Sequence, residues 1–573
     1  MATINNLTEF LTGVADAIRA KKSTTALINP QDFASEIASI SGGGDEPQPE
    51  GTHKVTFIDV DGTVLKTEYV ADGGSATAPD TPTREKCTFV EWMDDFSNVT
   101  EDIMIFPQWV SSDGYTHYQI SAAAGEYVRL QVQNASKTQP VTIYWGDGSS
   151  DTLPEDLSYH YVGHIYSAAV DGWIDVVGGG EYICVGIPYL ANTPVVGVVY
   201  GNFKNLKACC RQMHNLRYAV IPNTVTTVSS QDPFRNCKIL EYLAFPDSIT
   251  NLNASNGLAC ENLKYCRLSK NATSINSFFA SCRKLKEITV PESITSLPSM
   301  FAQYCTNLEK ITFNPRLTTI GKSAFTECYM LEDFNIPDSV TSIGSYCFRD
   351  CLGLKSVHLP SALITLDEGV FSNCQSLGNI TIPDTVTSIG IYCFRDCGNA
   401  VFDYDFSKLT SVGGGAFYDC IRLTGDLRLT GLVSITSGAF YNTGISSLYT
   451  TATRITMTGV DGAFRYCDIL KRVELPNIVT VEKLAFESCK ALELVILGEQ
   501  CTTIGDTAFR NCDALTRMVI KSTTPPALNS SALTGDTALT AIYVPDASVD
   551  TYKAATNWSA YADKILPLSQ FAE

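Results

Sequence analysis

The 573-residue sequence lacks the features that mark most membrane-spanning, exported and nucleic-acid-binding proteins. No apolar run approaches the ~20 residues that cross a bilayer. The amino-terminal stretch MATINNLTEFLTGVADAIRAKK has no early basic residue and no unbroken apolar segment, so we expect neither signal-peptide export nor membrane insertion. With a formal net charge of −20 there is no basic patch for phosphate, and nucleic acid is not an expected partner.

Common catalytic motifs are also missing: we find no Gly-x-Ser-x-Gly elbow, His-Glu-x-x-His pair or Walker loop. FIDVDGTV with GDGSSD imitates a haloacid-dehalogenase-type phosphatase site, with Asp59 as nucleophile and Asp61 as acid. That chemistry needs parallel strands wrapped by helices, whereas Gly- and Pro-rich strand patterns separate the two motifs. A hairpin at DVDG and a turn at GDG explain both motifs without a catalytic role.

Metal binding is not expected either. His160 and His164 would share one face of a strand, but a pair lacks the third ligand that zinc requires. The sequence therefore predicts no enzyme activity, no metal and no cofactor.

Cysteine, in contrast, is abundant, with twenty residues, of which twelve fall at a regular spacing. A Phe-x-x-Cys unit recurs every 22 to 24 residues, with Cys260 and Cys305 in slightly altered copies and Thr443 in place of one cysteine. The other members are Cys237, Cys282, Cys328, Cys351, Cys374, Cys397, Cys420, Cys467, Cys489 and Cys512. A repeat of this size cannot bury its own apolar side, so stacked copies must form a solenoid.

Each repeat follows the pattern L-x-x-I-x-I-P-x-x-V-T-x-I-G-x-x-x-F-x-x-C-x-x-L. We predict an α/β coil in which a short strand alternates with a turn and a short helical segment. The decapeptides SIGSYCFRDC (342–351) and SIGIYCFRDC (388–397) each add a second cysteine, Cys347 or Cys393. Zinc binding and a disulfide within each pair are the alternatives, but no histidine is near, and a buried thiol acts as a small apolar side chain. We therefore expect core thiols.

Residues 185–545 resemble leucine-rich repeats of the bacterial surface-antigen, BspA-like type, because IPDSVTSIGSYCFRDC and IPDTVTSIGIYCFRDC approach that family's consensus. The resemblance implies a long solenoid. Residues 546–573 resemble the closing segment of the same family, in which a short helix covers the last coil. Tyr552, Trp558 and Tyr561 suit such a cap.

The spacing of apolar residues in 1–41 predicts two short helices. They are too small to form a stable core without a partner or other copies. Their apolar residues are Leu7, Phe10, Leu11, Val14, Ile18, Phe33, Ile37 and Ile40. The stretch ADAIRAKKSTTALINPQDFASEIASI resembles a helical module of bacteriophage tail and fibre proteins, which implies an assembly anchor. SGGGDEPQPEG indicates a flexible linker, placed at 42–52.

Two small β domains are expected next. Residues 53–110 resemble the β-grasp-like Listeria-Bacteroides repeat, through the DG turn and the element TFVEW. Residues 111–184 resemble a PKD-like, immunoglobulin-fold sandwich through WGDGS and a later His-x-Tyr. The predicted fold is thus multi-domain: a helical hairpin, two β domains and a solenoid.

In the strand pattern L-x-x-I-x-I, the residue between the last two aliphatic positions should point outward. Over successive repeats these residues form a predicted polar row of Thr289, Thr312, Asn335, His358 and Thr381. This row could bind a bacterial surface glycan or protein; an ordinary solvated strand face is the simpler alternative. We favour a bacteriophage virion protein (fibre, tail-associated or head-decoration), anchored by residues 1–41 to other virion proteins and assembled in the host cytoplasm, where thiols stay reduced. The alternative is a BspA-like adhesin of the bacterial cell surface. A closed homo-oligomer, for example a trimer, is expected for a fibre.

Overall fold

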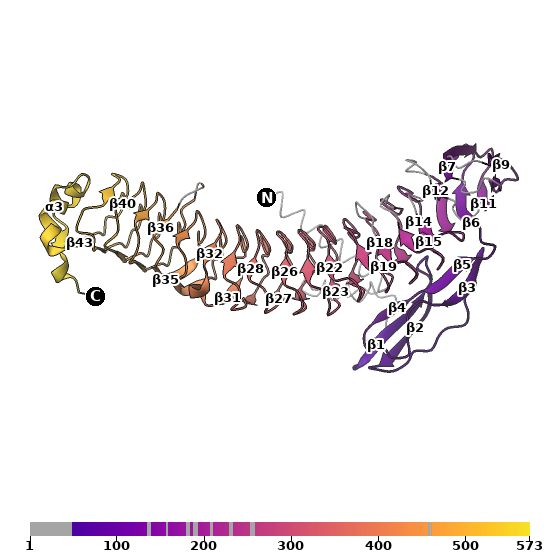
Figure 1. The fold of residues 1–573 in the computed structure, drawn as a ribbon, viewed down its shortest axis with the longest axis horizontal. Helices are drawn as coiled ribbons and strands as arrows, with labels where there is room; N and C mark the ends of the chain where they lie inside the picture. Colours follow the sequence, from indigo (N-terminus) through magenta and orange to yellow (C-terminus); the bar gives the residue numbers. More distant parts are fainter. Residues whose placement is uncertain are drawn as a thin grey trace, which may run out of the picture. The chain divides into compact units, whose positions relative to one another are not determined.

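The computed structural model describes residues 48–133, 139–155, 159–178, 184–186, 193–206, 210–228, 233–252, 258–456, 459 and 461–572 (Figure 1). The chain divides into two compact units. The first comprises Met1–Asp59, Thr63–Pro82 and Asp94–Phe106; the second comprises Val60–Gly62, Thr83–Met93 and Pro107–Glu573. The predicted helices of residues 1–41, with all eight apolar anchor residues, lie outside the described residues.

The first unit contains a three-stranded sheet in the order β2-β1-β4. β1 (Thr52–Ile58) pairs antiparallel with β2 (Val64–Ala71) and parallel with β4 (Ile103–Ile105). Val55, Phe57 and Ile105 are fully buried and form its core. The N–H of Asp59 donates to the carbonyl of Thr63 at 2.9 Å, which closes the DVDG hairpin that the sequence predicts.

The second unit begins with two sheets that share one apolar core, and the larger sheet extends beyond residue 184 through β13 and β15. The smaller sheet has the order β10-β7-β12 and the larger the order β15-β13-β6-β11-β8-β9. Their strands are β6 (Thr116–Ala122), β7 (Tyr127–Gln133), β8 (Val141–Tyr144), β9 (Ser150–Leu153), β10 (Tyr159–Ile165), β11 (Val170–Gly178), β12 (Cys184–Gly186) and β13 (Val195–Val199). A separate ribbon pairs β3 (Cys87–Trp92) with β5 (Pro107–Ser111).

The larger sheet runs directly into the solenoid. β13 pairs antiparallel with β6 of the sandwich and parallel with β15, the first longer strand of the coils. One buried cluster extends from Tyr118 in β6 to Ile565 near the carboxyl end. The sandwich therefore covers the amino-terminal end of the solenoid core, which stacked coils would otherwise leave exposed.

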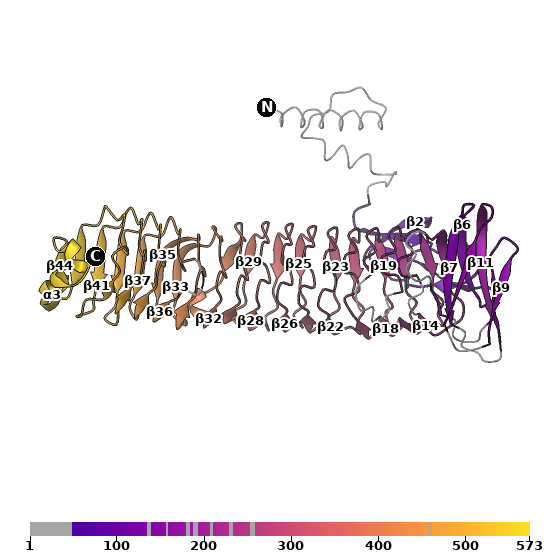
Figure 2. The ribbon, with the colours of Figure 1, turned by 90° about the horizontal axis from the view of Figure 1, so that it is seen from above.

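Each coil of the solenoid carries one longer and one shorter strand, which lie on opposite sides of the stack (Figure 2). The longer strands are β15 (Tyr218–Val220), β17 (Tyr242–Ala244), β19 (Tyr265–Arg267), β21 (Glu287–Thr289), β23 (Lys310–Thr312), β25 (Asp333–Asn335), β27 (Ser356–His358), β29 (Asn379–Thr381), β31 (Val401–Asp403), β33 (Thr424–Leu429), β35 (Gly444–Thr450), β37 (Arg472–Leu475), β39 (Leu494–Leu497), β41 (Arg517–Ile520) and β43 (Ala541–Val544).

The shorter strands form parallel ladders on the other side of the stack. They are β14 (Asn205–Leu206), β16 (Thr227–Val228), β18 (Asn251–Leu252), β20 (Ser274–Ile275), β22 (Ser296–Leu297), β24 (Thr319–Ile320), β26 (Ser342–Ile343), β28 (Thr365–Leu366), β30 (Ser388–Ile389), β32 (Ser411–Val412), β34 (Ser434–Ile435), β36 (Arg454–Ile455), β38 (Thr480–Val481), β40 (Thr503–Ile504) and β42 (Ala527–Leu528). A short 3₁₀ segment, η2 (Phe406–Lys408), follows β31.

The Phe-x-x-Cys segment is a turn in each described coil, so the predicted short helix and the α/β label for the solenoid were wrong. Tyr346 and Asp350 have left-handed backbone with φ of 60°. The N–H of Cys351 donates to the carbonyl of Phe348 at 3.2 Å, while the N–H of Phe348 donates to Val370 of the next coil at 2.8 Å. Backbone groups that an α-helix would pair internally thus join neighbouring coils, and the fold is a β-solenoid with few helices.

Phenylalanine and cysteine form two ladders through the core. Phe348, Phe371 and Phe394 stack with ring centroids 5.4 Å apart at each step. The thiol of Cys374 donates to the carbonyl of Phe348 in the preceding coil at 3.1 Å, and Cys397 donates to Phe371 at 3.0 Å. The regular spacing of these residues in the sequence therefore reports one contact repeated in every coil.

The second cysteines of the duplicated decapeptides are core residues, as predicted. Cys347 and Cys393 are fully buried free thiols, as are the register cysteines from Cys237 to Cys512. Burial raises the pKa of Cys351 to about 12, which keeps this thiol neutral. These side chains therefore act as small apolar residues.

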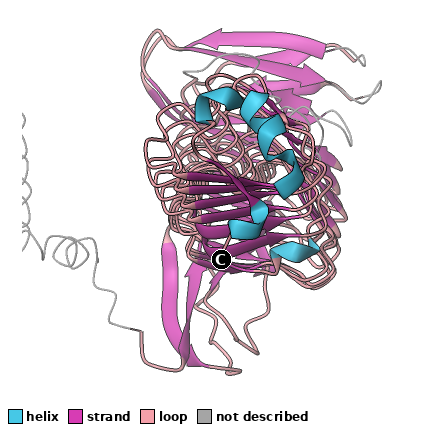
Figure 3. Ribbon diagram, turned by 90° about the vertical axis from the view of Figure 1, so that its left-hand side faces the viewer, coloured by secondary structure: helices cyan, strands magenta, loops and turns pink. Residues whose placement is uncertain are grey.

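The carboxyl end is covered by helical turns and a last strand that pairs parallel with β43 (Figure 3). Tyr552 and Trp558 are buried; the Tyr552 hydroxyl donates to the carbonyl of Ser522 at 2.8 Å and the Trp558 indole to that of Pro526 at 2.7 Å. The elements are η3 (Asp546–Ser548), α3 (Val549–Ala554), η4 (Trp558–Tyr561), β44 (Ile565–Pro567) and η5 (Leu568–Gln570).

Removing one ring from the phenylalanine ladder should destabilise the solenoid strongly. We expect Phe371→Ala to lower the free energy of unfolding by about 3–5 kcal/mol, because a fully buried ring leaves a cavity between two others. Urea denaturation followed by circular dichroism measures this loss. Ser372→Ala, the next residue in the same turn, is the control and should change stability by less than about 1 kcal/mol; equal losses would contradict the ladder's role.

Asp536 should make the carboxyl end sensitive to pH. It occupies the register position of the cysteines, is 7% exposed, and accepts from the N–H of Cys512 at 2.8 Å. Burial raises the pKa of Asp536 to about 7. The folded state thus holds a proton that the unfolded state releases near pH 4, and the resulting stabilisation is lost as the pH rises through about 7.

The Asp536→Asn variant tests this prediction. Between pH 5 and pH 8 the wild-type chain should lose more stability than the variant, and at pH 8 the variant should be the more stable of the two. Thermal unfolding midpoints at both pH values measure the difference. Identical pH dependence in the two proteins would show that Asp536 does not titrate in this range.

Candidate binding surface

The outward surface of the longer strands, here called the strand face, carries the predicted polar row. Thr289, Asn335, His358 and Thr381 are exposed, and Thr312 is half-buried. Thr289 lies beside Thr312 in paired strands, and Asn335 lies beside His358. The register expected from the sequence is therefore present in the fold.

Charged residues beside this row pair between neighbouring coils. Lys286 bonds to Glu309 at 2.9 Å, and Lys355 bonds to Glu332 at 2.6 Å. These side chains are largely exposed, so each pair contributes at most about 1 kcal/mol. The pairs balance charge along the strand face and leave its short polar side chains as the groups available to a ligand.

The amino-terminal part of the strand face is covered by residues of the second unit that precede the solenoid. The guanidinium of Arg84 lies over the Tyr218 ring, 4.0 Å from its centroid. Gly62 packs so closely on Tyr242 that a Cβ there would lie 2.5 Å from the ring. A side-chain nitrogen of Arg267 donates to the carbonyl of Met93 at 2.9 Å. The strand face is thus occupied over β15, β17 and β19.

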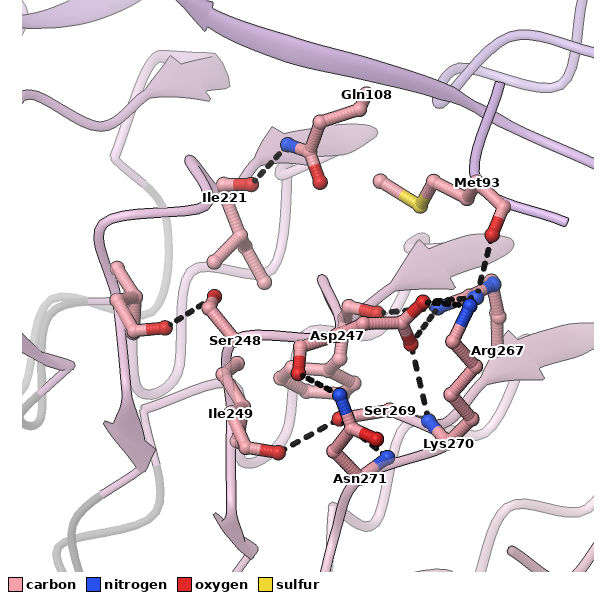
Figure 4. A network of polar contacts seen from close by, with 12 residues as sticks. Met93, Gln108, Ile221, Asp247, Ser248, Ile249, Arg267, Ser269, Lys270 and Asn271 are labelled. Carbon is pink, nitrogen blue, oxygen red and sulfur yellow. Dashed lines mark hydrogen bonds and ion pairs between the residues drawn. The ribbon is translucent and has the colours of Figure 1, made fainter. Parts of the chain in front are cut away.

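A buried arginine organises this cover (Figure 4). The side chain of Arg267 is 5% exposed, donates to the carbonyl of Phe245 at 2.8 Å, and forms two bonds of 3.1 Å to the carboxylate of Asp247. Burial alone would raise the pKa of Asp247, but Arg267 and Lys270 together lower it. One guanidinium therefore ties two coils to the segment that ends at Met93.

The carboxyl-terminal part of the strand face is covered by the end of the chain. Leu494, Ile496 and Val519 point outward from their strands, yet each is at most 5% exposed because Leu568 and Phe571 pack on them. A side-chain nitrogen of Arg517 donates to the carbonyl of Ala572 at 3.0 Å. Sequence reasoning missed this cover. Two runs of consecutive apolar residues, ELVIL and RMVI, indicate that the outward side is covered here, because the longer strands of other coils alternate apolar and polar residues.

Between these two covers, from β21 to β37, the outward side chains of the strand face are exposed or half-buried; we call this region the open window. Its carboxyl-terminal part carries larger side chains. The guanidinium of Arg428 lies 4.6 Å from the centroid of the Tyr449 ring, and the hydroxyl of Ser447 donates to Asp426 at 2.6 Å. The five residues of the predicted row all fall in this window.

The other predicted motifs have structural roles. Asp147 accepts from Ser149 and from His164, and these bonds lower the pKa of Asp147 to about 2. His164 stacks on Trp145 with centroids 5.1 Å apart, and the Trp145 indole donates to Asp151 at 2.7 Å. The GDGSSD loop is therefore held by its own side chains. In the part of the chain that the structure describes, no cluster of three or more potential metal ligands is present.

One network that the sequence did not suggest resembles a catalytic triad. The Nδ1 of His117 lies 2.7 Å from Asp175, and its Nε2 lies 3.4 Å from the hydroxyl of Ser111. His117 is fully buried and Ser111 is 6% exposed. Asp113 lies 3.0 Å from Ser111 and 2.9 Å from His117, and so competes for the serine proton. Asp175 also binds Lys86 at 3.0 Å, and the network joins strands rather than facing a substrate.

Comparison with known proteins identifies the solenoid. The model of the BspA type leucine-rich repeat region matches residues 205–332, 318–446, 402–516 and 433–556. None of the curated proteins matches the chain. In the described residues, no helix is long and apolar enough to span a membrane.

The chain also resembles solved structures of other leucine-rich repeat proteins. A leucine-rich repeat protein from Bacteroides ovatus ATCC 8483 is 24% identical over 59% of this chain and 90% of its own, with a TM-score of 0.51. A leucine rich cell surface protein from Faecalibacterium prausnitzii A2-165 is 22% identical over 67% of this chain and 96% of its own, with a TM-score of 0.35. The family model covers more than half of the sequence, and the chain belongs to the BspA-type leucine-rich repeat family.

Proposed function

We propose that the protein is a non-catalytic adhesin of the bacterial cell surface, and that the open window of its strand face binds a glycan or protein on another surface. The observation that carries this proposal is the uneven cover of one continuous face. Both ends of the strand face are occupied by the chain's own side chains, Arg84 at one end and Phe571 at the other. The segment between them presents Thr289, Asn335 and Thr381 to solvent.

The chemistry of the window favours a polar ligand. Hydroxyl, amide and imidazole groups both donate and accept hydrogen bonds, and short side chains lose little conformational entropy when a ligand fixes them. The strands from β21 to β37 present two or three outward residues each. This gives roughly 20 residues, which is what one side of a standard protein interface uses.

Membership of the BspA-type family favours the cell-surface assignment over a virion role. A second candidate, a bacteriophage virion protein anchored by residues 1–41, is supported by the resemblance of those residues to phage modules. It is also supported by the ladder of free thiols, including Cys374 and Cys397, which suits a protein that folds in reducing cytosol. Both candidates use the solenoid for display, and both expect contact with a surface through the window.

Arginine side chains introduced into the open window should weaken adhesion. We expect the double variant Thr289→Arg, Thr381→Arg to bind host epithelial cells, or susceptible bacterial cells for a virion protein, at least about tenfold less tightly than the wild type. Flow cytometry with the fluorescently labelled full chain measures this. Thr341→Arg, Thr385→Arg is the matched control, because both threonines are exposed but lie outside the strand face. Equal loss in both variants, or in neither, would contradict the assignment of the window.

The location of the protein separates the two candidates. For an adhesin, antibody against the solenoid should label intact producing bacteria, and purified phage particles should lack the chain by mass spectrometry. The virion candidate predicts the reverse, and it predicts that deletion of residues 1–41 prevents incorporation into particles. Labelling of intact cells in a strain cured of phage would exclude the virion role.

A further inference from the structure

The duplicated decapeptides place the same three side chains on the outer surface of two coils. Their cysteines and phenylalanines are buried, which leaves Tyr346, Arg349 and Asp350 in one copy, and Tyr392, Arg395 and Asp396 in the other. These residues lie in the segment between the shorter strand and the next longer strand, whose outward surface we call the turn face. The strand-face proposal does not use them.

Each tyrosine packs against a glycine of the next coil. A Cβ on Gly369 would lie 2.4 Å from the Tyr346 ring, and one on Gly415 would lie 2.5 Å from the Tyr392 ring. Only glycine leaves room for this close packing. Tyr392 nevertheless remains 41% exposed, and its neighbour Ile391 is 47% exposed. The alternation of Tyr and Gly therefore builds two aromatic platforms on the turn face.

The backbone at the two tyrosines is left-handed, as it is at the equivalent position of other coils. Tyr346 and Tyr392 have φ of 60° and 54°, in the left-handed region that disfavours bulky residues. The same turn position is glycine at Gly369, Gly415 and Gly438, where positive φ has no steric cost, and carries Met300, Ser323, Leu484 or Thr507 at positive φ in other coils.

Polar groups surround both rings. Arg349 bonds to Asp350 at 3.0 Å and Arg395 to Asp396 at 3.3 Å. The guanidinium of Arg395 lies 5.1 Å from the centroid of the Tyr392 ring, farther than in a close stack such as the 4.0 Å of Arg84 on Tyr218. A ring with guanidinium and carboxylate groups at its edge offers hydrogen-bond donors and acceptors to a flat, hydroxylated ligand.

The two copies differ in what borders the ring. The Tyr346 hydroxyl donates to Glu368, and this bond is the main cause that raises the pKa of Tyr346 to about 12. The residue equivalent to Glu368 beside Tyr392 is Gly414, which leaves that ring more open. Burial, together with the nearby carboxylate of Asp419, raises the pKa of Asp396. The platform at Tyr392 is therefore the more accessible of the two.

The spacing of the platforms is set by the solenoid. Two coil steps separate the two tyrosines, and the phenylalanines that follow them are stacked 5.4 Å apart at each step, so the two tyrosine rings lie roughly 10 Å apart along the axis, about twice the spacing of stacked strands. This length is comparable with a disaccharide of a linear polysaccharide.

We propose that Tyr346 and Tyr392 are two stacking subsites for one linear, uncharged glycan that runs along the turn face. Sugar rings would stack on the two tyrosines, and Arg349, Asp350, Arg395 and Asp396 would bond to the hydroxyl groups. The net charge of −20 disfavours a sulfated, sialylated or phosphorylated chain, which is why the ligand is assigned as neutral. This site is independent of the open window on the strand face.

Calorimetric titration of the full chain with neutral linear oligosaccharides tests the proposal. The probes are malto-, cello-, chito- and manno-oligosaccharides of about two to six sugars. In at least one series the affinity should rise by about tenfold or more once the chain is long enough to contact both rings. Tyr392→Ala and Tyr346→Ala should each remove that gain, with the larger loss at Tyr392, while Tyr392→Phe should retain it because the ring is kept.

Ile391→Ala is the matched control, since this side chain is equally exposed beside Tyr392 but has no ring. It should bind like the wild type, as should the strand-face variant Thr289→Arg, Thr381→Arg. Unchanged thermal midpoints would show that each variant folds. The proposal is overturned if none of the probes binds, if both alanine variants bind like the wild type, or if Ile391→Ala loses as much affinity as Tyr392→Ala.

Discussion

Every part of this structure depends on the inability of a single coil to bury its own apolar side. A repeat of 22 to 24 residues contributes a few aliphatic residues, one phenylalanine and one cysteine, and these are covered only when another coil stacks on them. The backbone enforces the same requirement. The N–H of Phe348 donates to the carbonyl of Val370 in the next coil, so the turn segments bond between coils where a helix would bond within itself.

The stacking requirement creates two ends that need cover, and the chain covers them in different ways. At the amino-terminal end the sandwich sheet continues into the coils through β13, so the two share one core. At the carboxyl end, Tyr552 and Trp558 close the core and their polar atoms bond to backbone carbonyls, as buried tyrosine and tryptophan usually require. The same devices limit the surface: Arg84 and Phe571 occupy the strand face beyond the open window.

The two candidate surfaces of this family member have different physical characters. The open window presents short polar groups such as Thr289 and Asn335 on a regular strand lattice, which suits an extended polar partner. The turn face presents aromatic rings, Tyr346 and Tyr392, at a spacing of two coils. A rigid solenoid fixes both spacings in advance, so a ligand that matches them loses little binding energy to rearrangement of the protein.

The sequence by itself determined the repeat period, the register of the buried thiols at Cys351 and Cys397, and the outward direction of Thr289 and His358. These properties recur in every coil, so each copy carries the same signal. Contacts between segments far apart in the chain were decided only in the tertiary structure. They include Arg267 with Met93, Phe571 over Ile496, and the network around His117. The turn conformation of the Phe-x-x-Cys segment also became clear only there, because its hydrogen bonds go to the neighbouring coil and leave no local pattern to recognise.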